Sequence, residues 1–137
     1  MAFPSKYAGA LLLIAFAVIC AGCMQPAQSG SKTPAGYNDV TAQEARSLKH
    51  ASEGKLVIID LSTAYEDGHL PMAINIPLDS LDSKIPGLDK SRPYLVYGQT
   101  DDAGIAGATK LVKAGFSPVY RLKGGYASRV TAGYPAE

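Results

Sequence analysis

Residues 94–115, YLVYGQTDDAGIAGATKLVKAG, restrict the fold more than any other part of the chain. The first four residues are a short apolar run of β-favouring side chains. The later apolar residues recur at the spacing of an amphipathic helix that ends at Gly115. The segment therefore predicts a buried strand, a polar loop and a helix. In open α/β sheets, ligands bind where such a loop leaves the carboxyl end of a strand, because free backbone N–H groups and the helix dipole point there.

The polar loop is the candidate ligand site, and its composition limits its chemistry. It consists of Gly98, Gln99, Thr100, Asp101, Asp102, Ala103 and Gly104. Because it contains no Cys, Lys or Arg and no Ser–His pair, an anion finds no cationic side chain within it. We expect Asp101 and Asp102 to accept the free N–H groups at the start of the helix. The alternative is a cation or amine site, but two carboxylates are too few to predict Ca²⁺, so we predict no metal and no cofactor.

The rest of the chain alternates strands and helices. Residues 55–61, KLVIIDL, are a continuous apolar run typical of a strand buried on both faces, and we expect this to be the central strand. Thr41 and Glu44 form a capping box before a predicted helix at 42–49. Short strands are predicted at 73–76 and 119–122, a helical turn at 78–81 and a last helix at 126–131. This order predicts an α/β fold with one central, mostly parallel sheet and helices on both faces.

Composition excludes one class of partner. The 137 residues include 13 basic and 12 acidic side chains, and none of the basic residues forms a run. Nucleic-acid binding depends on neutralising phosphates, so we do not expect that function. The balance of residues is that of one globular domain, which we expect to be a monomer.

The N-terminus has the pattern of an export signal, with Lys6 followed by an apolar core at 8–19. The four residues 20–23, CAGC, resemble a bacterial lipobox, although Cys20 stands where Leu is usual. This resemblance implies a lipoprotein signal peptide at 1–22, a lipid on Cys23 and a flexible tether at 23–37, followed by a folded domain at 38–137. The membrane is then a partner through the lipid. Because Met24 follows the lipidated position, we expect the periplasmic side of the outer membrane or the cell surface. A C-x-x-C redox or metal pair is the rival interpretation of the two cysteines.

Five further motifs occur in order over residues 40–137. They are VIIDL at 57–61, ExGHLPxAINIP at 66–77, YLVY at 94–97, AGFxxVYxLxGG at 114–125 and AGYP at 132–135. Together they resemble a single rhodanese homology domain. The resemblance implies sulfurtransferase activity carried by a persulfide-forming Cys directly after the YLVY strand. That Cys lies in a loop whose amides cradle the sulfur or a substrate anion, and several members place an Arg five residues later.

This chain departs from the family pattern at the positions that carry the chemistry. Gly98 occupies the nucleophile position and Ala103 the position of the later Arg, while Arg129 stands where a Trp is often found. Sulfur transfer needs a thiolate, and Thr100 has no evident base to activate it. We therefore expect a catalytically inactive rhodanese-like domain that acts as a binding or regulatory module in the bacterial cell envelope, with an envelope protein as its candidate partner. The alternative is a sulfurtransferase like the family at large.

Four other residues receive structural predictions. In the Gly-His-x-Pro turn, we expect His69 to close the turn by a hydrogen bond rather than to act as a general base. Asp60 is expected to accept nearby backbone or hydroxyl donors, and Met72 and Tyr97 are expected to be packing residues.

Overall fold

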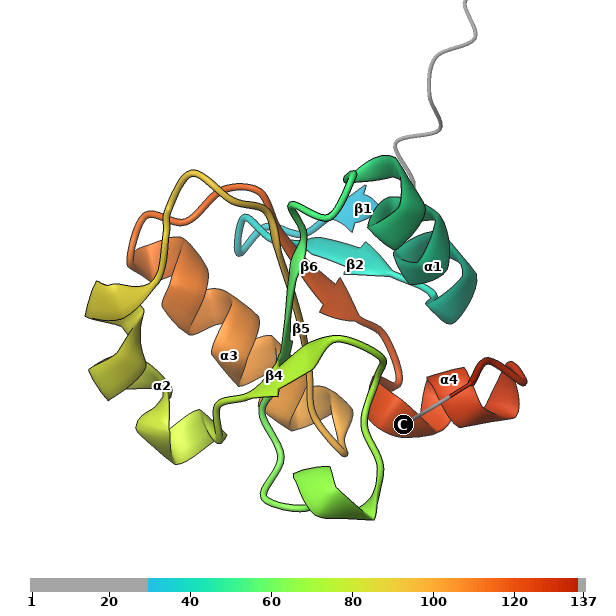
Figure 1. The fold of residues 1–137 in the computed structure, drawn as a ribbon. Coiled ribbons are helices and arrows are strands. Elements are labelled where there is room, and N and C mark those ends of the chain that lie inside the picture. The colour runs from blue at the N-terminus through green and yellow to red at the C-terminus, as the bar shows by residue number, and fades with distance from the viewer. Residues whose placement is uncertain (1–29, 136–137) are drawn as a thin grey trace, which may run out of the picture.

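The computed structural model describes residues 30–135 (Figure 1). The predicted signal peptide, Cys23 and the first part of the predicted tether lie outside the described residues. Among the described helices, none is long and apolar enough to cross a membrane.

One six-stranded sheet forms the centre of the fold, in the order β1-β2-β6-β5-β3-β4. All neighbouring strands are parallel except β1 and β2, which are antiparallel. The strands are β1 Ser31–Lys32, β2 Asn38–Val40, β3 Val57–Asp60, β4 Ala73–Asn75, β5 Tyr94–Tyr97 and β6 Val119–Leu122. The mostly parallel α/β sheet is therefore confirmed. The prediction that β3 is the central strand was wrong, because β3 lies between β5 and the edge strand β4.

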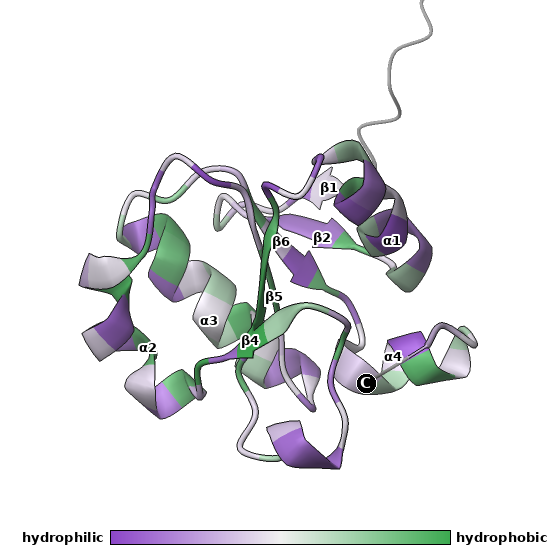
Figure 2. Cartoon of the chain, viewed as in Figure 1, coloured by the Kyte–Doolittle hydropathy of each residue, from purple (hydrophilic) through white to green (hydrophobic). Residues whose placement is uncertain are grey.

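Helices cover both faces of the sheet, as predicted (Figure 1). Alternate strand residues point to opposite faces, so the core divides into two clusters. One, containing Ile59, Val96 and Leu111, lies under α2 Leu78–Lys84 and α3 Asp101–Lys113. The other, containing Ile58, Leu95 and Ala45, lies under α1 Ala42–Ala51 and α4 Gly125–Thr131. Figure 2 shows hydrophobic residues along β3 and β5 and mostly hydrophilic residues on α1.

The predicted helices at 42–49 and 126–131 correspond to α1 and α4. The capping box of α1 is present, since Thr41 N–H donates to the Glu44 carboxylate at 2.7 Å and Glu44 N–H donates to Thr41 Oγ1 at 3.3 Å. α2 is longer than the predicted turn. Two short 3-10 helices, η1 Tyr65–Asp67 and η2 Ile85–Gly87, complete the elements.

The chain is already ordered before residue 38, where the folded domain was predicted to begin. Ser31 and Lys32 form β1, which pairs with β2 at the edge of the sheet, and Tyr37 is buried in the core. The expectation of an unstructured segment over 23–37 was therefore wrong for these residues. A two-residue edge strand needs only the backbone of its neighbour, so its polar side chains carry no strand pattern. Met72 also differs from expectation, because it is 69% exposed and has a φ of 67°.

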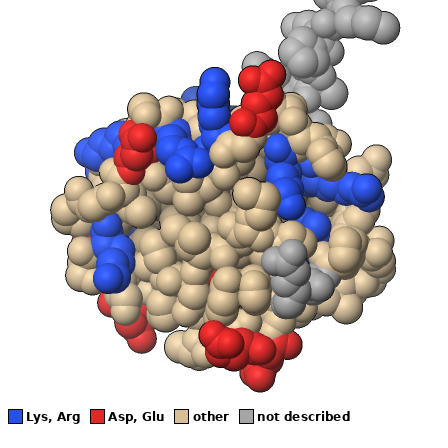
Figure 3. Space-filling model, viewed as in Figure 1, with Lys and Arg blue, Asp and Glu red and all other residues tan. Residues whose placement is uncertain are grey.

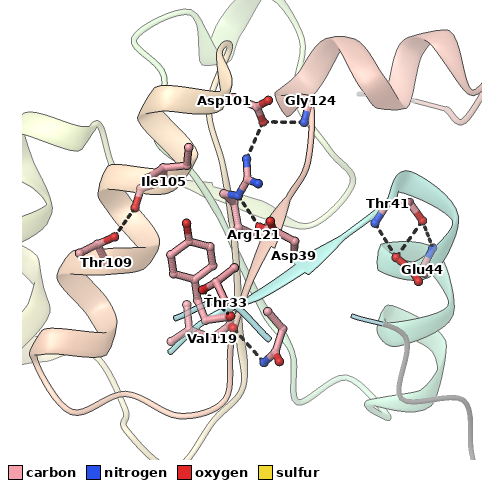
Figure 4. A network of polar contacts seen from close by, with 12 residues as sticks. Thr33, Asp39, Thr41, Glu44, Asp101, Ile105, Thr109, Val119, Arg121 and Gly124 are labelled. Carbon is pink, nitrogen blue, oxygen red and sulfur yellow. Dashed lines mark hydrogen bonds and ion pairs between the residues drawn. The ribbon is translucent and has the colours of Figure 1, made fainter. Parts of the chain in front are cut away.

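A buried ion-pair network joins the sheet to α3 (Figure 4). Arg121 on β6 is only 4% exposed. Its Nε lies 2.6 Å from Oδ1 of Asp39 on β2, and its Nη1 lies 2.6 Å from Oδ1 of Asp101 on α3. The same Asp101 oxygen accepts the Gly124 N–H at 2.6 Å. Hydrogen bonding to Asp39 is the main cause that raises the pKa of Arg121, so the guanidinium stays charged.

We predict that Asp101→Asn lowers the free energy of unfolding by roughly 1 to 2 kcal/mol. It removes a charged partner of a buried arginine, but the carboxylate is half-exposed, which moderates the loss. Asp102→Asn is the matched control because Asp102 is exposed and makes no side-chain hydrogen bond or ion pair with the described residues; we expect a change within about 0.5 kcal/mol. Urea denaturation of both variants measures the difference. Equal stabilities would contradict the structural role of Asp101.

Candidate functional site

The candidate loop is shorter in the structure than in the sequence prediction. β5 ends at Tyr97 and α3 begins at Asp101, so only Gly98, Gln99 and Thr100 form the connection. The other four predicted loop residues, Asp101, Asp102, Ala103 and Gly104, lie in the first turn of α3. The structure thus keeps all seven residues together at the carboxyl end of β5, as predicted, but most of them are helical.

The predicted capping role of the two aspartates was wrong. Thr100 is the N-cap residue of α3, and no side chain caps this end by a hydrogen bond. Asp101 points instead to Arg121 and to the Gly124 amide. A buried guanidinium is a stronger partner for a carboxylate than a helix amide, because both groups of the pair are charged. Asp102 is exposed to solvent.

The connection is closely packed on two sides. A Cβ added at Gly98 would lie 2.5 Å from the Ala103 Cβ and 3.3 Å from the Thr100 carbonyl oxygen. A Cβ added at Gly125 would lie 2.5 Å from the Gly98 oxygen, and the Tyr126 N–H donates to that oxygen at 2.9 Å. The first turn of α3 therefore packs against the Gly98 Cα, and the start of α4 packs against its carbonyl oxygen. A side chain at position 98 requires the start of α3 to move.

A buried polar group lies at the carboxyl ends of β3 and β5. Asp60 accepts the Tyr97 hydroxyl at 2.8 Å and the Ser62 N–H at 2.7 Å, which confirms its predicted role. The Tyr97 hydroxyl in turn accepts the Leu70 N–H at 2.9 Å. Burial, together with the Asp60 carboxylate, raises the pKa of Tyr97, so the phenol stays protonated. Tyr97 is fully buried, as expected of a packing residue, and both groups are used structurally.

His69 closes its turn, as predicted. Its Nδ1 lies 3.1 Å from the Tyr65 carbonyl oxygen, and its ring stacks on the Tyr65 ring with the centroids 3.7 Å apart. The Tyr65 hydroxyl donates to the Ala73 carbonyl at 2.7 Å. This cluster fixes the segment between β3 and β4 and occupies part of the free edge of β4.

The sequence alone gave no role to two arginines near this end of the sheet. Arg121 brings a cation to a loop that has none of its own, and Arg129 on α4 is only 5% exposed. The spacing offered a signal for both. Arg121 alternates with the apolar residues of β6 and shares the face of Val119, while Arg129 follows the buried Gly125 by four residues, which places both on one side of a helix.

Within residues 30–135, no three His, Cys, Asp or Glu side chains come together in a way that could hold a metal ion. Asp101 is held by Arg121, which also weakens the cation alternative for the loop.

Comparison with known proteins agrees with this architecture. The family model of the Rhodanese-like domain matches residues 41–130. Thiosulfate sulfurtransferase GlpE of Coxiella burnetii is 30% identical over 92 residues, covering 66% of this chain and 84% of that protein.

Solved structures show the same relationship. The rhodanese-like domain of Alr3790 from Anabaena has 32% identity and a TM-score of 0.65, covering 72% of this chain and 77% of that one. A protein from Lactobacillus plantarum has 25% identity and a TM-score of 0.64, covering 72% and 85%. Sequence, topology and these matches agree, and the chain belongs to the rhodanese-like domain family.

Proposed function

We propose that this chain is a rhodanese-like domain without sulfurtransferase activity, and that it acts as a binding or regulatory module. The observation that carries the proposal is the structure at Gly98. This residue directly follows β5, and Ala103 fills the space that its Cβ would need. A nucleophilic side chain is missing and the packing leaves no room for one in this arrangement.

The chemistry of sulfur transfer explains why this residue decides the function. A thiolate attacks the outer sulfur of thiosulfate, the S–S bond breaks, sulfite leaves and a persulfide remains on the protein. The chain has no cysteine after Cys23. Within the described residues, Asp60 and Tyr97 are engaged with each other and neither replaces a thiolate.

The alternative function is sulfur transfer, and the specific observation in its favour is the match to a relative named thiosulfate sulfurtransferase. That relative shares the domain over most of its length. Because the domain contains no cysteine, sulfur transfer by this chain would need a different group to carry the sulfur.

We further propose that the domain is held in the bacterial envelope by a lipid on Cys23, at the periplasmic side of the outer membrane or at the cell surface, where its partner is an envelope protein. The CAGC segment and the apolar core before it support this anchor. A single acyl chain gives weak membrane binding, so several chains on the modified cysteine are needed for stable anchoring.

The first test is a thiosulfate-to-cyanide sulfur-transfer assay on protein expressed without residues 1–23. This form contains no cysteine and keeps β1. We expect thiocyanate formation equal to that of buffer alone, with a GlpE-type sulfurtransferase as positive control. Turnover above buffer that increases with protein concentration would refute the proposal and favour the alternative.

The packing at Gly98 makes a separate prediction. Gly98→Ala should lower the free energy of unfolding by roughly 1 to 3 kcal/mol, because the new methyl overlaps Ala103. Adding Ala103→Gly should restore part of that loss, and urea denaturation measures this coupling. Gly87→Ala is the control, since a Cβ there meets no atom within 4 Å and no positive φ is required. A Gly98→Ala protein as stable as the wild type would show that Ala103 leaves room for a side chain at position 98.

The lipid anchor is tested by expressing the full chain in a bacterial host with an alkyne-labelled palmitate. The wild type should incorporate the label and sediment with membranes. Cys23→Ser should lose both properties, whereas Cys20→Ser, the matched control, should keep the label. Labelling that survives Cys23→Ser would exclude this residue as the site.

A further inference from the structure

Arg129 is a buried cation without a counter-charge among the described residues. Arg129 is only 5% exposed, and its Nε is buried and makes no hydrogen bond with the described residues. The three ion pairs in residues 30–135 involve Lys110, Arg121 and their aspartates, and none includes Arg129. A long arginine normally buries its stem and leaves its head in water. Here the Nε at the base of the head is buried as well.

A second arginine contacts the same tyrosine ring as the first. The guanidinium carbon of Arg129 is 5.5 Å from the centre of the Tyr134 ring, and that of Arg46 on α1 is 5.2 Å from the centre of the same ring. The Tyr134 N–H donates to the Arg129 carbonyl at 3.2 Å, which ties this tyrosine to α4. The arginine pair is therefore fixed where α1 and α4 meet. Figure 3 shows one group of Lys and Arg side chains at the right of the molecule and others at its left and upper left.

The two positive charges disfavour each other. Burial is the main cause that lowers the pKa of Arg129, and Arg46 lowers it further. The tyrosine face attracts both cations, but a ring quadrupole compensates a buried charge less well than an anion does. Among residues 30–135, no ion pair supplies a negative group to Arg129. Arg46 is exposed and leaves an approach from solvent.

We propose that Arg129, Arg46 and Tyr134 form a binding site for an oxyanion, either a carboxylate or a phosphate group of a ligand. A guanidinium presents two parallel N–H donors that match both groups. Arg129 is the buried donor and Arg46 closes the site from the rim. The site is made by different residues from the loop at 98–104, so it does not rest on the proposed loss of sulfur transfer.

The surface beside the site has room for a larger ligand. Tyr134 also lines an open hollow of about 720 Å³, whose walls include one cation, Lys123, one carboxylate, Asp101, and the first residues of α1. A ligand whose anionic group contacts the arginines can extend along this hollow.

The test uses the full chain in a non-ionic detergent, with sodium phosphate or sodium acetate added at constant ionic strength against chloride. We expect the melting temperature to rise with the added anion beyond the chloride reference, because binding to the folded state stabilises it. We also expect a saturable shift of the Arg129 Nε–H resonance in ¹⁵N-labelled protein. A response to acetate alone identifies a carboxylate ligand, and a response to phosphate alone identifies a phosphate ligand.

Variants locate the site. Arg46→Gln should weaken anion binding about tenfold, as expected for loss of a charged hydrogen-bond donor. Lys113→Gln, which removes an exposed cation of α3, should leave it unchanged. Arg46 is exposed, so its variant tests the site even if Arg129→Gln fails to fold. Phosphate and acetate effects equal to chloride, or identical binding by Arg46→Gln and the wild type, would overturn the proposal.

Discussion

The charge of Arg121 has to be neutralised inside the protein, and much of the arrangement at the carboxyl end of the sheet follows from this. The residue points to the α3 face of β6, where alternate positions are apolar, and it is buried together with the core. Leaving such a cation unpaired would cost several kcal/mol. Asp39 and Asp101 neutralise it from β2 and α3, so the first turn of α3 is drawn towards β6. Gly104 allows this close approach, because an added Cβ would lie 3.2 Å from the Arg121 Cγ.

The position of that first turn has a consequence for the site. With α3 beginning at Asp101, Ala103 lies against Gly98 and the Gly124 amide donates to Asp101. The loop whose backbone N–H groups surround the sulfur in active family members corresponds here to the segment after β5. In this chain, Ala103 and Tyr126 pack against that segment at Gly98. The family model matches residues 41–130, and we propose that Gly98, at the position of the family's nucleophile, serves packing instead. Fold membership alone therefore does not establish the activity of this chain.

The sequence predicted those features that depend on local patterns. The apolar runs located β3, β5 and β6, and Thr41 with Glu44 located the start of α1. It did not predict β1, whose two polar residues are held only by pairing with β2. Nor did it predict the role of Asp101 on α3, because its partner Arg121 is 20 residues away on β6. The candidate loop was located correctly, but its internal structure depends on that distant contact. Arg129 was recognised only as a departure from the family pattern, since its burial depends on how α4 packs.

We propose that the segment after β5 is closely packed and does not bind an anion. The most direct measurement follows the backbone ¹⁵N–¹H resonances of residues 98–104 while thiosulfate is added, with chloride holding the ionic strength constant. We expect no saturable shift of these amides, whatever the response of Arg129. A saturable shift that is largest at Gly98, Gln99 and Thr100 would show that this segment binds thiosulfate and would refute the proposal.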